Sequence, residues 1–125
     1  MPKQAFNLPG VTGRPYSQAV RAGDFIFLSG TTGAVNSKGE KINGIKDQTK
    51  QCLENIGRLL EAMGASLDGA VKCTVFLTDV QLFAQMNEVF RTYFPKDPPA
   101  RSTVIAGLVQ PDMLVEIELI IYAPR

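Results

Sequence analysis

The chain has 125 residues, of which 45% are apolar, so we expect one domain (residues 1–125) with a substantial core. The chain contains thirteen basic and twelve acidic residues and no long run of like charge, which argues against a nucleic-acid-binding groove. With no histidine and only two cysteines, Cys52 and Cys73, a metal site is not expected, and both cysteines are interpreted as reduced core residues.

Residues 1–6 contain neither an apolar signal segment nor an arginine-rich transit pattern. No apolar run reaches the length that spans a membrane. These features predict a cytoplasmic protein.

The N-terminal third predicts a hairpin. Residues 7–15 are punctuated by glycine and proline and are expected to form a loop. Two strands are expected, Ser17–Ala22 and Phe25–Ser29, joined by the two-residue turn Gly23–Asp24. Residues 25–28 are apolar on both faces, so one face should pack on helices and the other on something else.

A first helix is predicted from Asp47 to Met63, with Asp47 as its N-cap and Gly64 as its C-terminal stop. Gly57 lies inside this helix, where it costs about 1 kcal/mol relative to alanine, and is interpreted as a close-packing point. The apolar stripe consists of Cys52, Ile56, Leu59, Leu60 and Met63.

A strand and a second helix follow. Residues 71–77 alternate so that Val71, Cys73, Val75 and Leu77 share one face. Asp79 is expected to cap a helix from Val80 to Phe94. Its buried stripe consists of Phe83, Met86, Phe90 and Phe94, with Asn87 at the edge.

The last two strands carry charge where a buried strand should have none. In the first, Arg101, Thr103 and Ile105 share a face; in the second, 114–122, Glu116 and Glu118 share a face. If these strands are neighbours, an arginine and a glutamate can meet on a largely apolar face. Such a meeting is either a buried ion pair or a site for an anion and a water.

The order strand-strand-helix-strand-helix-strand-strand predicts an α+β fold, in which a mixed sheet has both helices on one face. The uncovered face would carry apolar hairpin residues, Tyr122 and the two glutamates. Because such a half-apolar face rarely stays in water, we expect self-association, in a closed ring.

Chemistry in this chain must use arginine, glutamate, hydroxyls, backbone and water. Arg101 offers a fork of donors that holds a carboxylate, although a salt bridge explains it equally well. Glu116 or Glu118 could orient and deprotonate a water, and spacing does not choose between them. Three further side chains, those of Tyr16, Ser29 and Asn87, could bond a ligand, although packing, turn and boundary roles are the more ordinary explanations.

Five short segments occur along the chain in the order Pro15-Tyr16-Ser17-Gln18-Ala19, Leu28-Ser29-Gly30, Thr74-Val75-Phe76-Leu77-Thr78-Asp79, Pro99-Ala100-Arg101-Ser102 and Val115-Glu116-Ile117-Glu118. Together they resemble the RidA (YjgF-like) family of enamine/imine deaminases, and the resemblance covers nearly the whole chain. The last two segments are the specific part of the resemblance.

The resemblance implies a chorismate-mutase-like fold and a homotrimer with ligand clefts between subunits. It implies cofactor-free hydrolysis of 2-iminobutanoate and 2-iminopropanoate, which PLP-dependent dehydratases form from threonine and serine, to 2-oxo acids and ammonia. By motif, Arg101 would grip the substrate carboxylate, and Glu116 would position or activate water. The remaining cleft residues would be Tyr16, Ser29, Asn87 and the backbone of Thr103.

Two departures from the family pattern bear on the cleft. Thr103 stands where many members have cysteine, and Arg14 stands where glycine commonly precedes Pro-Tyr-Ser, so that an added charge could alter substrate preference. The alternative function is a non-catalytic trimeric protein that binds small carboxylates or acts like a chaperone. A nuclease or translation inhibitor is a third possibility, against which the absent histidines and near-neutral charge argue.

Overall fold

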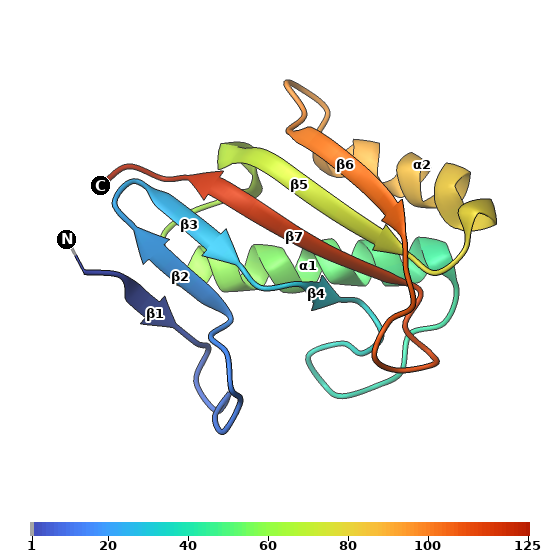
Figure 1. Cartoon of the computed structure of the whole chain (residues 1–125), viewed down its shortest axis with the longest axis horizontal. Helices are drawn as coiled ribbons and strands as arrows, with labels where there is room; N and C mark the ends of the chain where they lie inside the picture. The colour runs from blue at the N-terminus through green and yellow to red at the C-terminus, as the bar shows by residue number, and fades with distance from the viewer. Residues whose placement is uncertain (1) are drawn as a thin grey trace.

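The computed structural model describes residues 2–125, and Met1 lies outside the described residues. Within that range the chain forms seven strands and two α-helices (Figure 1). They are β1 (Gln4–Phe6), β2 (Ala19–Ala22), β3 (Phe25–Leu28), β4 (Thr31–Thr32), α1 (Ile45–Ala62), β5 (Ala70–Leu77), α2 (Phe83–Tyr93), β6 (Ala100–Ile105) and β7 (Val115–Tyr122).

The strands form one mixed sheet in the order β1-β2-β3-β7-β5-β6, and the short β4 pairs with β7 beyond the end of β3. Only β5 and β6 pair in parallel, and the chain between them passes through α2. The final strand therefore lies in the middle of the sheet, between β3 and β5 (Figure 1).

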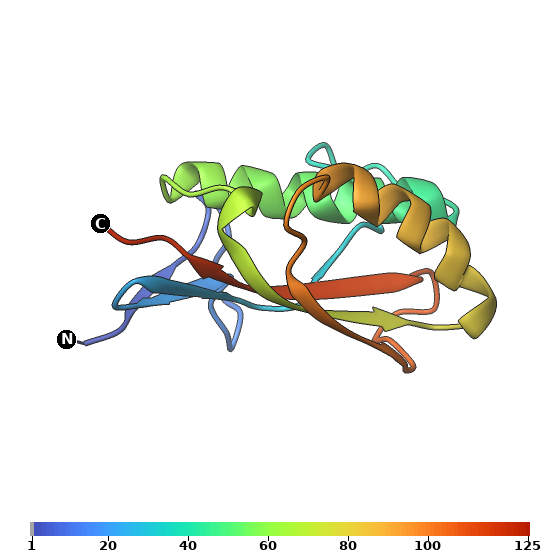
Figure 2. The same cartoon turned by 90° about the horizontal axis from the view of Figure 1, so that it is seen from above.

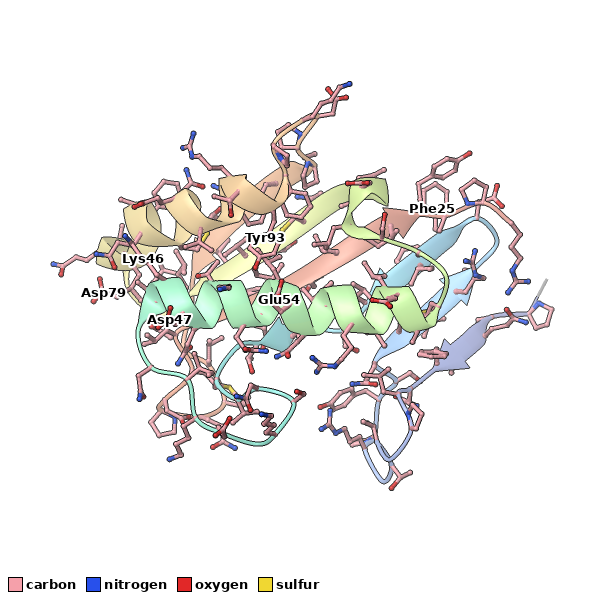
Figure 3. All side chains as sticks on the ribbon, turned by 180° about the vertical axis from the view of Figure 1, so that it is seen from behind. Phe25, Lys46, Asp47, Glu54, Asp79 and Tyr93 are labelled. Carbon is pink, nitrogen blue, oxygen red and sulfur yellow. The ribbon has the colours of Figure 1, made fainter. Side chains whose placement is uncertain are left out.

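Both helices cover the same face of the sheet, which confirms the predicted α+β arrangement (Figure 2). The core lies between the sheet and the helices and includes Ile26, Leu53, Ile56, Leu60, Val75, Leu77, Met86, Ile117, Leu119 and Ile121. At the helix–helix contact, the Tyr93 hydroxyl donates a 3.0 Å hydrogen bond to Glu54 (Figure 3). Burial, followed by this hydrogen bond, raises the pKa of Tyr93 to about 12.

Three predictions about α1 have different outcomes. The helix begins at Ile45, so Asp47 lies in its first turn and the N-cap is Gly44, whose φ of 85° suits glycine. The predicted Asp47 cap is therefore wrong, although its charge still favours the helix N-terminus. Gly64 ends the helix at φ 75°, as predicted. Gly57 is not a close-packing point, because no atom lies within 4 Å of a Cβ built there.

The second predicted helix consists of a 3₁₀ turn, Val80–Leu82, followed by α2. The Asp79 carboxylate accepts a 2.8 Å hydrogen bond from the Gln81 backbone N–H, so the predicted cap is confirmed. Of the predicted apolar stripe, Phe83 is the exception, since 41% of it is exposed.

The predicted strand from 71 to 77 contains an irregularity that its alternation does not reveal. The register between β5 and β7 shifts between Ala70 and Lys72, and Val71 is 44% exposed instead of joining Cys73 in the core. An extra residue in one strand produces this bulge. Strands β1 and β4 were not predicted, because two or three residues are too few to show a period.

Strand β4 approaches α1 very closely at Gly33. A Cβ built on this buried residue would lie 1.8 Å from the backbone oxygen of Gln48 and 2.6 Å from the backbone nitrogen of Cys52. No real side chain accepts such distances, so only glycine allows β4 to pack against the helix backbone here. The segment that follows β3 is therefore tightly packed at this point.

The buried side chain of Gln48 joins three parts of the chain. Its amide nitrogen donates to the carbonyl oxygens of Ile42 (2.9 Å) and Asp112 (2.8 Å). Its amide oxygen accepts from the Leu114 backbone N–H at 2.9 Å. Segments 33–44 and 106–114 are therefore both held on the first turns of α1.

The sheet face away from the helices, called here the open face, carries exposed apolar side chains. Its large exposed apolar residues include Phe25 (38%), Phe27 (45%), Val104 (41%) and Tyr122 (49%). The Phe25 and Tyr122 rings lie 5.5 Å apart. The predicted half-apolar uncovered face is thus confirmed. Within residues 2–125, no helix combines the length and apolar character needed to cross a membrane.

Candidate active site

Arg101 and Glu116 lie on opposite faces of the sheet. Arg101 pairs with Cys73 of β5, which pairs with Leu119 of β7, so all three share the helix-covered face. Glu116 pairs with Phe76 and points to the open face. Arg101 could meet a β7 glutamate only if β6 and β7 were neighbours, and within one chain this condition is not met, because β5 separates the two strands.

Arg101 borders a cavity of about 580 Å³ at the edge of the sheet, called here the Arg101 cavity. Its other lining residues are Asn87, Phe90, Arg91, Phe94, Pro95, Pro98 and Pro99. The guanidinium carbon lies 4.8 Å from the Phe90 ring centroid and 5.7 Å from that of Phe83. These aromatic faces attract the cation and fix its position.

Asn87 also borders the Arg101 cavity, from the half-buried side of α2. Among residues 2–125, no carboxylate forms a salt bridge with Arg101. Both glutamates of β7 lie on the other face, so the salt-bridge explanation fails inside the chain. The guanidinium of Arg101 and the amide of Asn87 thus border the same cavity, and both groups carry donors that suit a carboxylate.

Tyr16, Ser29 and Glu116 border a different pocket, of about 520 Å³, called here the Tyr16 pocket. Its other lining residues are Leu8, Arg14, Gln18, Gly30, Thr31, Thr32, Val35, Asn36, Asn55, Arg58, Leu59, Val109, Gln110 and Met113. Both pockets fall within the size range of small-molecule sites, about 300–1,000 Å³. The Ser29 hydroxyl donates to the Ser17 carbonyl oxygen at 2.6 Å, which fixes its oxygen as an acceptor toward the pocket.

The carboxyl of Glu116 lies in a partly buried, confined position. Burial, with a smaller contribution from the charge of Glu118, raises the pKa of the Glu116 carboxyl above its ordinary value. Beside it, a Cβ on Gly30 would lie 2.3 Å from Oε2 of Glu116, so the missing side chain leaves room for this carboxylate. Glu118 is exposed and does not border the pocket, so the geometry distinguishes the two glutamates.

Comparison with known proteins identifies the family of this chain. Residues 9–123 match a family model described as endoribonuclease L-PSP. A RutC family protein of Pyrococcus horikoshii is 49% identical over 109 residues, 86% of each chain. The 2-iminobutanoate/2-iminopropanoate deaminase of Mus musculus is 38% identical over 107 residues, 85% of this chain and 79% of that protein. RidA from Psychrobacter sp. PAMC 21119 has a crystal structure that matches with a TM-score of 0.82 at 39% identity, covering 90% of this chain and 91% of that one.

The chain belongs to the RidA (YjgF-like) family. Five of the site residues that the resemblance implied border the two pockets. Tyr16, Ser29 and Glu116 border the Tyr16 pocket, whereas Arg101 and Asn87 border the Arg101 cavity. The Arg101 cavity has no carboxylate among its lining residues, and the Tyr16 pocket contains Glu116 but not Arg101.

The two departures from the RidA pattern lie in different places. Thr103 shares a sheet face with Arg101 but pairs with Val75 and does not border the Arg101 cavity of the single chain. Arg14 borders the Tyr16 pocket, and its guanidinium carbon lies 5.9 Å from the Tyr16 ring centroid. The departure at Arg14 therefore changes the charge of the pocket itself.

Among the lining residues of the Tyr16 pocket that the sequence did not reveal are Gly30, Asn55 and Arg58. Gly30 was part of a motif, but its role depends on the position of the Glu116 carboxylate. Asn55 and Arg58 fall on the polar side of α1, where no periodic pattern separates a pocket residue from a solvated one.

Both cysteines are free, buried and outside the two pockets. The Cys52 thiol donates to the Thr31 carbonyl oxygen at 3.0 Å. Burial raises the pKa of both thiols, that of Cys73 to about 12. Since the thiolate is the reactive form, both are inert core residues, as predicted.

Proposed function

We propose that the protein hydrolyses small 2-imino acids, in particular 2-iminobutanoate and 2-iminopropanoate, to 2-oxo acids and ammonia. It acts as a homotrimer in which the Tyr16 pocket of one copy faces the Arg101 cavity of another. One observation supports the proposal: Arg101 and Glu116 lie on opposite faces of the sheet, so two copies are needed to bring these two side chains into one site. The apolar open face supplies a surface for this association.

The reaction requires only groups that this chain carries. Arg101 holds the substrate carboxylate through paired hydrogen bonds, with Asn87 beside it. Glu116 accepts a proton from a water whose oxygen attacks the imine carbon, giving a carbinolamine. The nitrogen gains a proton, the C–N bond breaks and ammonia leaves, while the hydroxyl proton is lost and a carbonyl remains. Imine and water thus give 2-oxo acid and ammonia.

The barrier that the enzyme must remove is modest, since imines hydrolyse unaided in water. Several kcal/mol suffice, at about 1.4 kcal/mol for each factor of ten in rate. Orientation by Arg101 and one general base can supply this. The cytoplasmic location stays a prediction.

The test of this function follows an imine directly. A PLP-dependent threonine dehydratase generates the imine from threonine or serine, semicarbazide traps it, and this protein competes for it. Wild-type protein should divert imine to oxo acid. We expect Glu116→Gln to lower the rate by about a hundredfold or more, the usual contribution of a general base. Glu118→Gln, the matched control on the same strand, should keep its activity because its side chain lies outside the pocket.

The alternatives give different results in this test. A protein that only binds small carboxylates would leave the trapped imine unchanged and would bind 2-oxobutanoate equally well with Glu116→Gln. A nuclease would degrade RNA incubated with the wild-type protein, whereas a deaminase leaves it intact.

The raised pKa of Glu116 predicts an acidic limit to activity. A general base acts only when deprotonated, so kcat/KM should fall with decreasing pH at a midpoint above the ordinary glutamate pKa of about 4.3. Rates measured between pH 4 and 8, with spontaneous hydrolysis subtracted, give this midpoint. A fall centred at or below the ordinary value would exclude Glu116 as the titrating base.

Stability measurements separate this effect from unfolding. The pKa of Glu116 is higher in the folded protein than in the unfolded chain, so protonated Glu116 adds to the free energy of unfolding. This contribution is fully present at pH values below the unfolded pKa and is lost as the pH rises through the folded pKa. Glu116→Gln removes the buried charge and should therefore be no less stable than wild type at pH 7. A loss of activity in this variant then reports chemistry and not unfolding.

A further inference from the structure

The Tyr16 pocket holds more positive charge than the uncharged side chain of 2-iminopropanoate or 2-iminobutanoate needs. Its charged lining residues are Glu116 and two arginines, Arg14 and Arg58. Within residues 2–125, neither arginine forms a salt bridge. The carboxylate common to all 2-imino acids is already assigned to Arg101 of another copy, so these two cations have a different use.

Arg58 is held in place by side chains of α1. The amide of Asn55 donates to the carbonyl oxygens of Thr32 (3.1 Å) and Val35 (3.3 Å), which ties it to β4 and the segment after it. The Asn55 oxygen accepts from Arg58 at 3.2 Å and from Gln51 at 2.9 Å. Only this one of the five guanidinium N–H donors of Arg58 is used among the described residues, and the rest are available to an anion.

Arg14 is positioned by Tyr16. Its guanidinium lies beside the Tyr16 ring, at 5.9 Å from the centroid, in the attractive geometry of a cation and an aromatic face. Arg14 reaches the pocket from the loop before β2, whereas Arg58 reaches it from α1. Two separate elements therefore bring a positive charge to one pocket.

The Tyr16 pocket also has apolar walls, which suit a short apolar chain. Several apolar side chains border it, namely Leu8, Leu59, Val109 and Met113. The pocket of about 520 Å³ exceeds what the methyl or ethyl side chain of 2-iminopropanoate or 2-iminobutanoate fills. A side chain of one or two methylenes ending in a carboxylate uses both the apolar wall and the guanidinium donors.

We propose that Arg14 and Arg58 are specificity-determining residues that select 2-imino dicarboxylates, the imines of acidic amino acids. This inference rests on the proposed function, because it concerns the same cleft and reaction. The substrate then arises when an acidic amino acid passes two electrons and two protons from its CH–NH2 group to a flavin, which leaves the imine, and its hydrolysis by water gives a 2-oxo dicarboxylate and ammonia. Charge-assisted hydrogen bonds to the second carboxylate provide the discrimination.

The test compares two imines and two stable ligands. A flavin-dependent amino-acid oxidase with catalase generates 2-iminoglutarate from glutamate or 2-iminobutanoate from 2-aminobutanoate, and kcat/KM is measured for each. Calorimetry gives the affinities for 2-oxoglutarate and 2-oxobutanoate independently of turnover. Wild type should favour the dicarboxylate by about tenfold or more in both measurements. Arg58→Gln and Arg14→Gln should each reduce this ratio severalfold.

The control is Lys50→Ala, which removes an exposed cation from the same helix outside the Tyr16 pocket and should leave the ratio unchanged. If the preference for the dicarboxylate is the same in wild type and in both arginine variants, and 2-iminobutanoate is still hydrolysed, the dicarboxylate inference is overturned and the proposed function stands. Hydrolysis of neither imine, with arginine-dependent binding of 2-oxoglutarate, overturns the function but supports the dicarboxylate site. Failure of both measurements overturns both.

Discussion

Mixing Arg101→Ala chains with Glu116→Gln chains should restore activity that neither variant has alone. Each cleft takes Arg101 from one copy and Glu116 from another, so a random mixture at equal amounts regenerates about a quarter of the clefts. Arg101→Ala alone should lose about a hundredfold in kcat/KM, since a charge-assisted pair contributes roughly 3 kcal/mol. The mixture, unfolded and refolded together, is assayed for imine hydrolysis against each variant treated in the same way.

A second mixture distinguishes shared clefts from clefts within one chain. The double variant Arg101→Ala/Glu116→Gln is refolded with an equal amount of wild type. If each cleft takes Arg101 from one copy and Glu116 from another, about a quarter of the clefts keep both residues. If one chain supplied both residues, about half would remain active and the first mixture would recover nothing. That pair of results would contradict the cleft between copies, as would a monomer in sedimentation at micromolar concentration.

Gly33→Ala should destabilise the fold by about 3 kcal/mol or more, the upper end of overpacking effects. The added methyl would lie 1.8 Å from the Gln48 backbone oxygen and 2.6 Å from the Cys52 backbone nitrogen, and neither can turn away as a side chain can. Strand β4 and α1 must therefore separate. Urea denaturation at one fixed protein concentration measures the loss, because an oligomer's apparent stability depends on concentration.

Gly57→Ala is the matched control for this prediction. It adds the same methyl group to the interior of α1, where no atom lies within 4 Å. Alanine should stabilise the helix there by about 0.5–1 kcal/mol. Equal effects of the two substitutions would show that the β4–α1 contact is looser than the geometry indicates.

The sequence predicts best where a period repeats over several turns or pleats. The α1 stripe and the alternation of Val115, Ile117, Leu119 and Ile121 are confirmed because burial on one face imposes the pattern. The start of α1 was missed because Gly44 offers a favourable backbone conformation and no side-chain cap. Strand β4 was missed because its pairing is determined by β7, and two threonines carry no pattern of their own.

The sequence offered candidate site residues but not their arrangement in space. Alternation along β7 correctly placed Glu116 opposite the core-facing residues. The relation of Glu116 to Arg101 depends on which strand lies between β6 and β7, and local patterns hold no information on strand order. The roles of Gly30 and Arg58 depend likewise on contacts between segments that lie far apart along the chain.

The amide of Gln48 has a consequence for motion. It bonds segments 33–44 and 106–114 to the same turn of α1, and these segments carry the walls of the Tyr16 pocket at Asn36 and Met113. Either wall can swing out only if bonds to this one side chain break, which leaves its other partners unsatisfied in a buried position. We therefore expect the two walls to open together, as one cooperative unit, and not one loop at a time.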